Sequence, residues 1–523
     1  MVLLSAFTTK SNAGIFVLIF TIMFTVFALS SDGHRYTSDE DFAHLQTIRM
    51  VTLEPHPLYV DGESKKLFEY PTIYPPQFNK GNPCTNFIIC SPVSVATSLT
   101  QYPFVFLNHH LKIITENTVQ FTIDDFPDQH YVFWRNSQNP DFTFLELFYG
   151  PFFASLSVSV FFLICNLFSY KLKISLFLTF LFGLSTPLWA YSQTSLNVIP
   201  TLFFLILSFY FFIRYQKTHS VLFLIFCSLS LGFSYLIRED IALVIVPLII
   251  YFLISLRNTN QKLKSSLCFF LSLIPFYFFG VMFDYLRYGF SVSETSSATI
   301  SSFSNYTSNT LAVGISGMLF SPGVGLFIFA PVLLTIFFSL PDFYRRNKGL
   351  ALFFLGTICL FLIYFGSIQF WHGLVSWSER YLLIMIPFFL IPLGSSLMSR
   401  TSVMLRGIIL SLGSLGFLFN LAYVLQDVSW FIWGSPGRTG LFSLGKHTTD
   451  LYIHDAVIWT FEYSQLTHSI LLVFSNLRID LFFLKLFGLP TFIGIVIALL
   501  IPQILMLRKL YLNENYNLTK SDI

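Results

Sequence analysis

Charged side chains are scarce in this chain. Only 11% of its 523 residues are Asp, Glu, Lys or Arg, whereas 54% are hydrophobic and 19% are aromatic. Soluble domains carry about 25% charged residues, so the composition excludes an ordinary water-soluble fold. Apolar runs of roughly 20 residues recur along the chain, which is the length that a helix needs to cross a bilayer. The sequence therefore predicts an all-α polytopic membrane protein.

A basic tract is also lacking. The formal net charge is only +3, and no stretch has the Lys- and Arg-rich composition that follows nucleic-acid phosphates. We therefore expect no nucleic-acid partner. The chain has no Walker A sequence, no glycine-rich dinucleotide fingerprint and no serine nucleophile elbow in a suitable setting.

Cysteine is rare, with six residues in the chain. Four of them fall inside apolar runs, where we expect small core residues. Cys84 and Cys90 lie instead in a long polar segment. If that segment is extracytoplasmic, the two can form a disulfide, and otherwise they are free thiols. The sequence leaves both alternatives open.

The apolar runs predict about twelve transmembrane helices. We interpret the first run as a retained helix rather than a cleaved signal peptide, because many more spans follow it. The predicted spans are 14–30, 144–168, 174–192, 195–213, 219–237, 241–256, 266–285, 319–340, 349–367, 381–398, 405–424 and 486–507.

Basic residues in the short connections predict an orientation. They all fall on one side of the twelve-span arrangement, and the positive-inside rule makes that side cytoplasmic. They are Lys10, Lys171, Lys173, Arg214, Lys217, Arg257, Lys262, Lys264, Arg345, Arg346, Lys348, Arg400, Arg406, Arg508 and Lys509. We therefore expect a multi-pass protein of the cell membrane with both termini in the cytoplasm.

This orientation leaves two long loops on the outer side. The predicted segments are a cytoplasmic N-terminus (1–13), a first transmembrane helix (14–30), an outer loop (31–143), a helical core (144–424), a second outer loop (425–485), a last transmembrane helix (486–507) and a cytoplasmic tail (508–523). In the first loop, 87–99 and 102–107 are apolar but too short to span, so we expect interfacial helices. The second loop contains Trp430, Trp433, Tyr452, Trp459 and Tyr463, which are either interface anchors or surfaces that stack on sugar rings.

Ionisable residues are nearly absent from the predicted spans. Ion-coupled transporters place such residues within the bilayer at their sites, so their absence disfavours a transporter. The charges gather instead at the outer ends of the helices, at Asp39, Glu40, Asp41, Arg238, Glu239, Asp240, Asp284, Arg287, Glu379 and Arg380. A polar layer at this level suits a substrate with a lipid tail in the bilayer and a polar head at its surface.

The acidic stretch Asp39-Glu40-Asp41 follows the first span. A carboxylate there can take a proton from an acceptor group that attacks a sugar carbon, and neighbouring carboxylates raise one another's pKa toward neutrality. The alternative is an acidic helix start after Ser38. Asp39 and Asp41 also have the D-x-D form that can hold a divalent cation on a diphosphate, but we do not expect a metal or another cofactor to be required.

Arg380 precedes an apolar helix within the segment 371–383. A guanidinium at that level can bind a phosphate and stabilise its charge as it leaves. The alternative is an interfacial Arg that pairs with Glu379. Arg238 and Asp240 form the outer turn of a helical hairpin, where they either contact a sugar or a phosphate or mark the membrane boundary.

Histidines offer fewer candidates. His372 can act as an acid or base, or donate a hydrogen bond to a phosphate. His44, His109 and His110 lack a metal-ligand spacing, and we expect them to be structural.

Three stretches resemble a known family. They are Ser38-Asp39-Glu40, the segment Gly317–Pro331 with its sequence GMLFSPGVGLFIFAP, and the segment Trp371–Leu383 with its sequence WHGLVSWSERYLL. They are similar to motifs of the GT-C-fold glycosyltransferases that use polyprenyl-phosphate sugars. That group includes the protein O-mannosyltransferases and the lipid A aminoarabinose transferases.

The resemblance implies transfer of a sugar from a polyprenyl phosphate to an acceptor at the outer face. Asp39 would match the catalytic carboxylate, Glu40 its neighbour, and Arg380 an arginine that faces the lipid phosphate. Trp371 and Tyr381 share the third motif and, with Asp41 and Asp240, are candidate substrate-binding residues. Protein, lipid and glycan acceptors all occur in such families.

Two features depart from the family pattern. The region 91–107 has no basic residue where relatives often have Lys or Arg, and Ser378-Glu379 replaces their Gly-Pro. The sequence thus predicts an inverting membrane glycosyltransferase with a carboxylate base. The alternatives are a lipid-linked sugar flippase or other transporter, an inactive membrane scaffold, and a metal-dependent oligosaccharide transferase.

Overall fold

The structure is a computed structural model of the whole chain. It describes residues 10–33, 38–53, 59–60, 89–90, 93–111, 145–258, 261–288, 311–368, 371–373, 377–399, 402–426, 434–435, 438–439, 458–475 and 479–521. Cys84 lies outside these residues, and so does the side chain of Cys90, so the predicted alternatives for this pair stay open.

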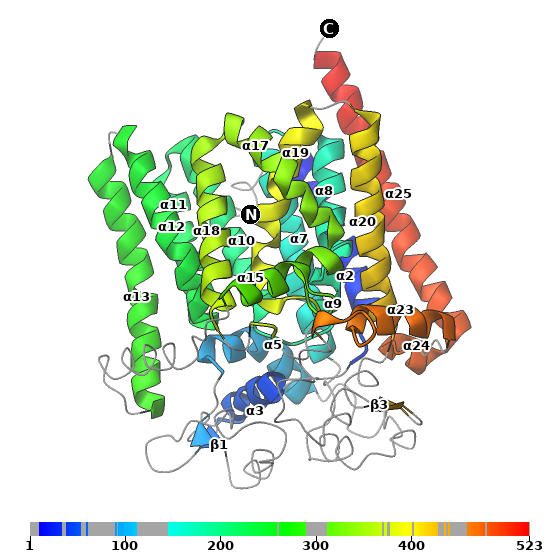
Figure 1. Ribbon diagram of the computed structural model, residues 1–523. Helices are drawn as coiled ribbons and strands as arrows, with labels where there is room; N and C mark the ends of the chain where they lie inside the picture. Colours follow the sequence, from blue (N-terminus) through cyan, green and yellow to red (C-terminus); the bar gives the residue numbers. More distant parts are fainter. Residues whose placement is uncertain are drawn as a thin grey trace.

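A bundle of helices forms the body of the molecule (Figure 1). Its members are α2 (Lys10–Leu29), α7 (Tyr149–Leu167), α8 (Leu172–Leu184), α9 (Leu188–Tyr191), α10 (Val198–Thr218), α11 (Val221–Ile237), α12 (Ala242–Ser255), α13 (Lys262–Tyr288), α15 (Leu311–Phe320), α16 (Leu326–Phe329), α17 (Ile336–Arg346), α18 (Lys348–Gly366), α19 (Ile386–Ser399), α20 (Val403–Val424) and α25 (Leu489–Ser521). Helices α3 (Ser38–Val51), α5 (Val95–Leu111), α23 (Gln465–Ser475) and α24 (Phe482–Phe487) lie at one end of it.

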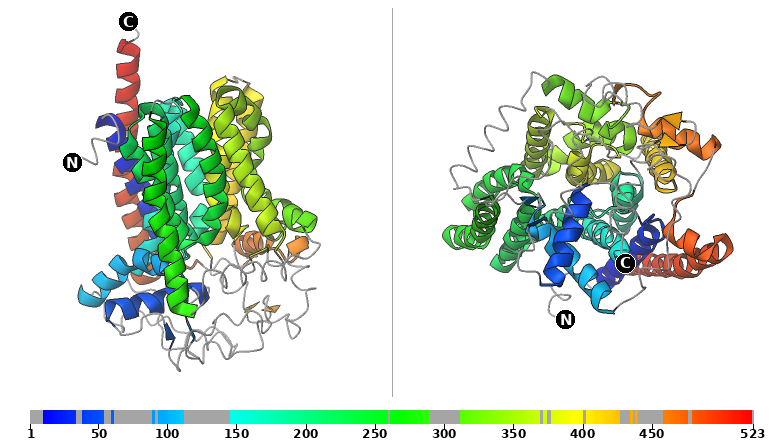
Figure 2. Two further views of the ribbon diagram at one scale, coloured as in Figure 1. Left: turned by 90° about the vertical axis from the view of Figure 1, so that its left-hand side faces the viewer. Right: turned by 90° about the horizontal axis from the view of Figure 1, so that it is seen from below.

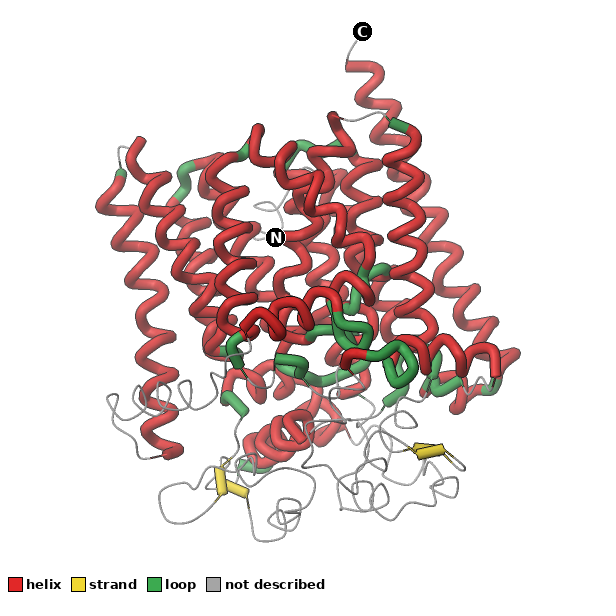
Figure 3. Tube along the Cα trace, viewed as in Figure 1, coloured by secondary structure: helices red, strands yellow, loops and turns green. Residues whose placement is uncertain are grey.

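Short elements complete the described structure. The 3₁₀ turns are η3 (Glu146–Phe148), η4 (Glu239–Ile241), η5 (Leu256–Asn258), η6 (Pro331–Thr335) and η7 (Arg380–Met385). Strand β1 (Tyr59–Val60) pairs antiparallel with β2 (Ile89–Cys90), and β3 (Gly434–Ser435) pairs antiparallel with β4 (Arg438–Thr439). Helix dominates the tube drawing in Figure 3, which confirms the predicted all-α class.

Eight helices of the described part are long and apolar enough to cross a membrane. They run over Asn12–Leu29, Glu146–Leu167, Val198–Thr218, Lys262–Phe283, Lys348–Gly366, Arg380–Ser399, Val403–Val424 and Leu489–Leu512. Each overlaps a predicted span, so the prediction of a multi-pass membrane protein is confirmed. The count of twelve stays a prediction, because α8 and α11 are apolar but shorter than this criterion requires.

The predicted span 319–340 is wrong as a single helix. This stretch is broken into α15, α16, η6 and α17. Pro322 and Pro331 cannot donate the backbone hydrogen bonds of a continuous helix. At Gly325 the chain returns close to the backbone of Ser321. A Cβ at this position would lie only 2.5 Å from the Ser321 nitrogen, so the turn requires glycine. The backbone therefore folds back on itself in the second motif.

The predicted interfacial helices 87–99 and 102–107 are also revised. One helix, α5, replaces them from Val95 to Leu111, and it continues through Pro103, whose ring is exposed. Residues 89–90 belong to β2 instead. Helix α5 packs against α3, and both lie across the end of the bundle (Figure 2).

The two ends of the bundle differ. The described chain starts and finishes at one end, whereas α3, α5, α23 and α24 lie at the other (Figures 1 and 2). We call the first the terminal end and the second the α3 end. The α7–α8 and α10–α11 connections, with Lys171 and Lys217, lie at the terminal end, so the chain direction agrees with the predicted alternation of spans.

Candidate functional site

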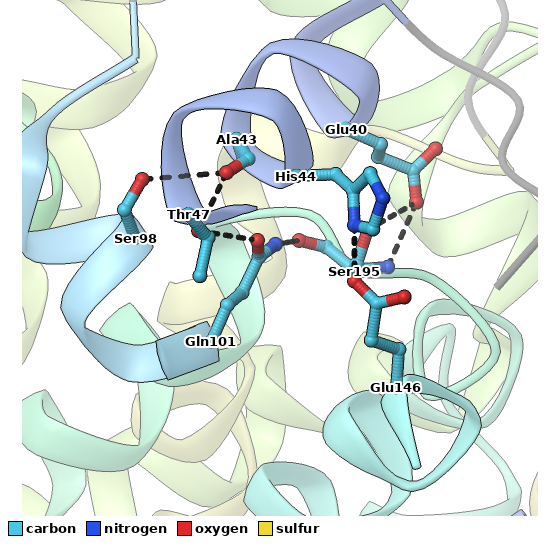
Figure 4. A network of polar contacts seen from close by, with 8 residues as sticks. All are labelled: Glu40, Ala43, His44, Thr47, Ser98, Gln101, Glu146 and Ser195. Atoms are coloured by element: carbon cyan, nitrogen blue, oxygen red, sulfur yellow. Dashed lines mark hydrogen bonds and ion pairs between the residues drawn. The ribbon is translucent and has the colours of Figure 1, made fainter. Parts of the chain in front are cut away.

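Helix α3 is fixed to the bundle by buried polar side chains (Figure 4). The Glu40 Oε1 atom accepts hydrogen bonds from the Ser195 backbone N–H at 2.8 Å and from the Ser195 hydroxyl at 3.2 Å. The Ser195 carbonyl in turn accepts from the Gln101 amide of α5 at 3.3 Å. The turn between α9 and α10 therefore holds both α3 and α5.

A second set of contacts repeats this attachment one helical turn later. His44 contacts Glu146 of η3, and both are buried. The Thr47 hydroxyl donates to the Gln101 carbonyl oxygen at 3.2 Å. Glu40, His44 and Thr47 follow the i, i+4, i+7 spacing of one helix face. The expectation that His44 is structural agrees with this contact.

The structure describes the side chain of only one of the three acidic candidates, Glu40. Helix α3 starts at Ser38, as the helix-start interpretation predicts. The side chains of Asp39 and Asp41 lie outside the described residues, but their backbone belongs to α3. Because Glu40 is adjacent to Asp39 and is anchored, the backbone position of Asp39 at the start of α3 is fixed.

The end of α2 reaches the same turn. The Trp189 indole N–H donates to the Ser30 hydroxyl at 3.0 Å. The Gln193 amide donates to the Ser30 carbonyl and, at 3.1 Å, to the carbonyl of Val424 at the end of α20. The ends of α2 and α20 are thus joined beside the attachment of α3.

The third motif packs into this region through Trp377. Its ring is fully buried, 4.1 Å from the Tyr423 ring and 4.7 Å from the Phe329 ring, measured between centroids. Its indole N–H donates to Asn420 at 2.9 Å. Tyr423 lies close enough to Glu40 to feel its charge. Tyr423 thus contacts the third motif, and Glu40 of the first motif lies within electrostatic range of the same tyrosine.

The second motif contacts the third through Gly317. A Cβ at this position would lie 2.0 Å from the Trp371 ring, so only glycine allows the contact. Trp371 is buried, with its ring 5.5 Å from His372 and 5.9 Å from Trp459. The contact with Trp459 joins one predicted loop aromatic to the site.

The turn that leads into η7 has an unusual backbone. Ser378 has a φ of +60°, a left-handed conformation that glycine adopts readily and other residues do not. The family pattern has glycine at this position. Ser378 therefore has the left-handed backbone that glycine favours, although it is not a glycine.

Glu379 and Arg380 follow that turn. Glu379 is 1% exposed, and its Oε1 atom accepts the Tyr381 N–H at 3.2 Å. Burial raises the pKa of the Glu379 carboxyl well above its usual range; the Tyr381 N–H and the Arg380 charge lower it by less. In the described part, the predicted alternative of an ion pair between Arg380 and Glu379 is not formed.

Arg380 is held by an aromatic neighbour instead. Its guanidinium carbon lies 5.1 Å from the centroid of the Tyr381 ring, and an Nη2–H donates to the Tyr381 hydroxyl at 3.2 Å. The Tyr381 ring stacks on Phe365 of α18 at 4.3 Å. The guanidinium is therefore positioned at the α3 end of α18 and α19.

Arg238 and Asp240 pair with each other at η4. The Arg238 Nε and Nη2 atoms donate to the two Asp240 carboxylate oxygens at 3.1 and 2.5 Å. Tyr364 of α18 lies within electrostatic range of both Asp240 and Tyr381. The structure thus brings Asp240 and Arg380 toward the same part of the α3 end, while the charge of Arg238 is already balanced by its own neighbour.

Several site residues escape sequence reasoning. Ser195, Gln193 and Tyr423 connect the motifs, yet none lies in a recognisable pattern. Asn420 is the residue for which a sequence signal exists, because an amide within the apolar run 405–424 requires a hydrogen-bond partner.

Part of the chain matches a known protein family. The family described as dolichyl-phosphate-mannose-protein mannosyltransferase matches residues 152–281. This match confirms the resemblance predicted from the three motifs, and it covers a part of the chain that contains none of them. A search of the curated proteins finds no match.

Two solved structures are similar over most of their length. The crystal structure of ArnT from Cupriavidus metallidurans in the apo state has 11% identity and a TM-score of 0.46, covering 87% of this chain and 76% of that chain. The structure of the same protein bound to undecaprenyl phosphate has 12% identity and a TM-score of 0.44, covering 87% and 77%.

Proposed function

We propose that this chain is a membrane glycosyltransferase that moves a sugar from a polyprenyl-phosphate donor to an acceptor. The observation that carries the proposal is the meeting of the three motifs at the α3 end, together with the independent family match over residues 152–281. The α3 end would be the extracytoplasmic face, because the connections rich in Lys and Arg lie at the other end.

Asp39 is the general base in this proposal. Its carboxylate takes a proton from the acceptor as the acceptor attacks the anomeric carbon of the sugar, with inversion. Glu40 supports this role by anchoring the first turn of α3 to Ser195. Asp41 would contact the sugar or the acceptor.

Arg380 binds the donor phosphate. Its charge stabilises the phosphate as the glycosidic bond breaks, so no separate general acid is needed. His372 would add a hydrogen bond to the same phosphate. Arg238, held by Asp240, would contribute charge at the rim of this site rather than a direct phosphate contact of its own.

The sugar binds between aromatic and acidic side chains. Trp371 and Tyr381 offer flat apolar faces for sugar C–H groups, and Asp240 offers acceptors for hydroxyl groups. Membrane lipid would surround the polyprenyl tail beside the bundle. The reaction would require no divalent cation, so transfer should survive strong chelation; loss of transfer on chelation would favour the D-x-D alternative.

Surface glycans and glycolipids of cells with and without this protein, compared by mass spectrometry, test the function. The expected result is one sugar modification that disappears with the protein and returns with the wild-type chain. The control is Glu239→Gln, an exposed carboxylate next to Asp240, which should restore it. Movement of lipid-linked sugar across sealed vesicles without any acceptor product would instead favour a flippase.

A further inference from the structure

A short segment of the predicted second outer loop is attached to the second motif. We call residues 458–464 the strap. The Gly323 N–H donates to the Ile458 carbonyl at 2.9 Å, and the Ser464 hydroxyl donates to the Pro322 carbonyl at 2.5 Å. Ile458 and Ser464 are both buried. Each end of the strap is therefore held by one of two adjacent residues in the broken helix.

These contacts serve backbone groups that a continuous helix would have paired internally. The helix is interrupted between α15 and α16, and buried backbone groups need hydrogen-bond partners. The Ser464 hydroxyl also accepts the Leu466 N–H at 3.2 Å, so it caps the start of α23 at the α3 end (Figure 1). The broken helix and α23 together fix the position of the strap.

The strap places Trp459 beside the third motif. The centroid of its ring lies 5.9 Å from that of Trp371, and the two planes are tilted by 55°. Trp371 is itself buried against Gly317. The Trp459 side chain is 39% exposed. Part of its indole is thus accessible next to a candidate substrate-binding residue, while another part is supported from within the protein.

Phe461 provides a contrast within the same strap. Its side chain is 57% exposed, and it has no ring contact in the described part of the chain. A general role as a membrane-interface anchor would apply to Phe461 at least as well as to Trp459. The contact with Trp371 distinguishes Trp459. An indole held in one orientation offers a flat apolar face to sugar C–H groups at a low cost in side-chain entropy.

We propose that Trp459 is a specificity-determining residue whose accessible face contacts the sugar of the donor, and that the strap positions it for this contact. This inference rests on the proposed function. The contact adds affinity for a lipid phosphate that carries a sugar. It adds nothing for the same lipid phosphate without one, so the two ligands separate a sugar contact from a structural role.

The test measures binding of undecaprenyl phosphate, either without a sugar or carrying mannose, glucose or aminoarabinose, to the purified full-length protein in nanodiscs. For the sugar that the wild type binds most tightly, Trp459→Ala should bind about two- to tenfold more weakly, the range of one aromatic contact. It should bind the sugar-free lipid as the wild type does. Trp459→Phe retains a ring and should lose less. Phe461→Ala is the matched control and should bind both lipids normally.

Unchanged binding of every lipid by Trp459→Ala would overturn the inference. Equal losses for the sugar-free and sugar-bearing lipids would do so as well, because they would indicate a structural role. Equal losses in Trp459→Ala and Phe461→Ala would instead indicate a membrane anchor. Normal donor binding with a higher KM for the acceptor would place the ring at the acceptor. If the wild type binds none of these lipids, the proposed function fails as well, so the two failures are distinguishable.

Discussion

At the scale of single residues, the acidic stretch after the first span divides into different roles. Glu40 is a buried anchor whose two hydrogen bonds hold α3 to Ser195. Asp39, one residue earlier, carries the proposed chemistry. Substitutions should therefore distinguish the two carboxylates: changes at Glu40 should lower stability, and changes at Asp39 should lower sugar transfer.

Glu40→Ala is expected to lower stability. It leaves the Ser195 N–H buried without its acceptor, which costs about 1–3 kcal/mol. Thermal unfolding and limited proteolysis of α3 would measure the loss. Glu40→Gln keeps an acceptor and should lose much less. Equal stability of Glu40→Ala and the wild type would contradict the anchor.

The backbone at Ser378 gives a second residue-scale prediction. Its left-handed conformation costs a residue with a Cβ roughly 1 kcal/mol, so Ser378→Gly should be more stable than Ser378→Ala by about that amount. Both variants remove the hydroxyl, so the comparison isolates the backbone. If Ser378→Ala melted at a higher temperature than Ser378→Gly, the left-handed backbone at Ser378 would be contradicted.

At the scale of elements, the contact between the second and third motifs depends on Gly317. Gly317→Ala places a methyl group against the Trp371 ring and should displace it. We expect a loss of stability of about 1–3 kcal/mol from overpacking and a larger loss of transfer. Thermal unfolding and a transfer assay measure the two effects.

Gly356 is the matched control for this substitution. It lies in α18, and a Cβ there would meet no atom within 4 Å. Gly356→Ala should be neutral or slightly stabilising, because alanine favours helix over glycine by about 0.5–1 kcal/mol. Similar losses in both variants would show that the Trp371 contact is not the cause.

The elements also show how far sequence reasoning reaches. Apolar runs located the long helices because burial in lipid requires about 20 apolar residues in succession. The helix break at 321–335 contains Pro322, Gly325 and Pro331, which disfavour a continuous helix. The span was predicted from hydropathy alone, which does not detect such a break. The contact of Glu40 with Ser195 spans 155 positions, and only the packing of the whole bundle could reveal it.

At the scale of the whole molecule, orientation is the main prediction. A membrane-impermeant thiol reagent, applied to intact cells, should label His110→Cys, which is exposed on α5 at the α3 end. It should not label Lys264→Cys, exposed at the start of α13 at the terminal end, until the membrane is permeabilised. The reverse pattern would invert the proposed topology.

The sequence motifs predicted more of the candidate site residues than the amino-acid composition did. Sequence reasoning located the acidic stretch, Trp371 and Arg380, and the structure brings their segments to one end of the bundle. It could not foresee that Arg238 is held by Asp240 or that Glu379 is buried, because both depend on how the η4 and η7 turns fold.

The central claim is sugar transfer with Asp39 as base. The most direct test incubates labelled polyprenyl-phosphate sugar with membranes from cells that lack the native protein and carry either the wild type or Asp39→Asn at equal amounts. The wild type should consume the donor and label an acceptor, whereas Asp39→Asn should fold normally and transfer at least about a hundredfold more slowly, the scale of a lost general base. Equal transfer by the two proteins would contradict the account.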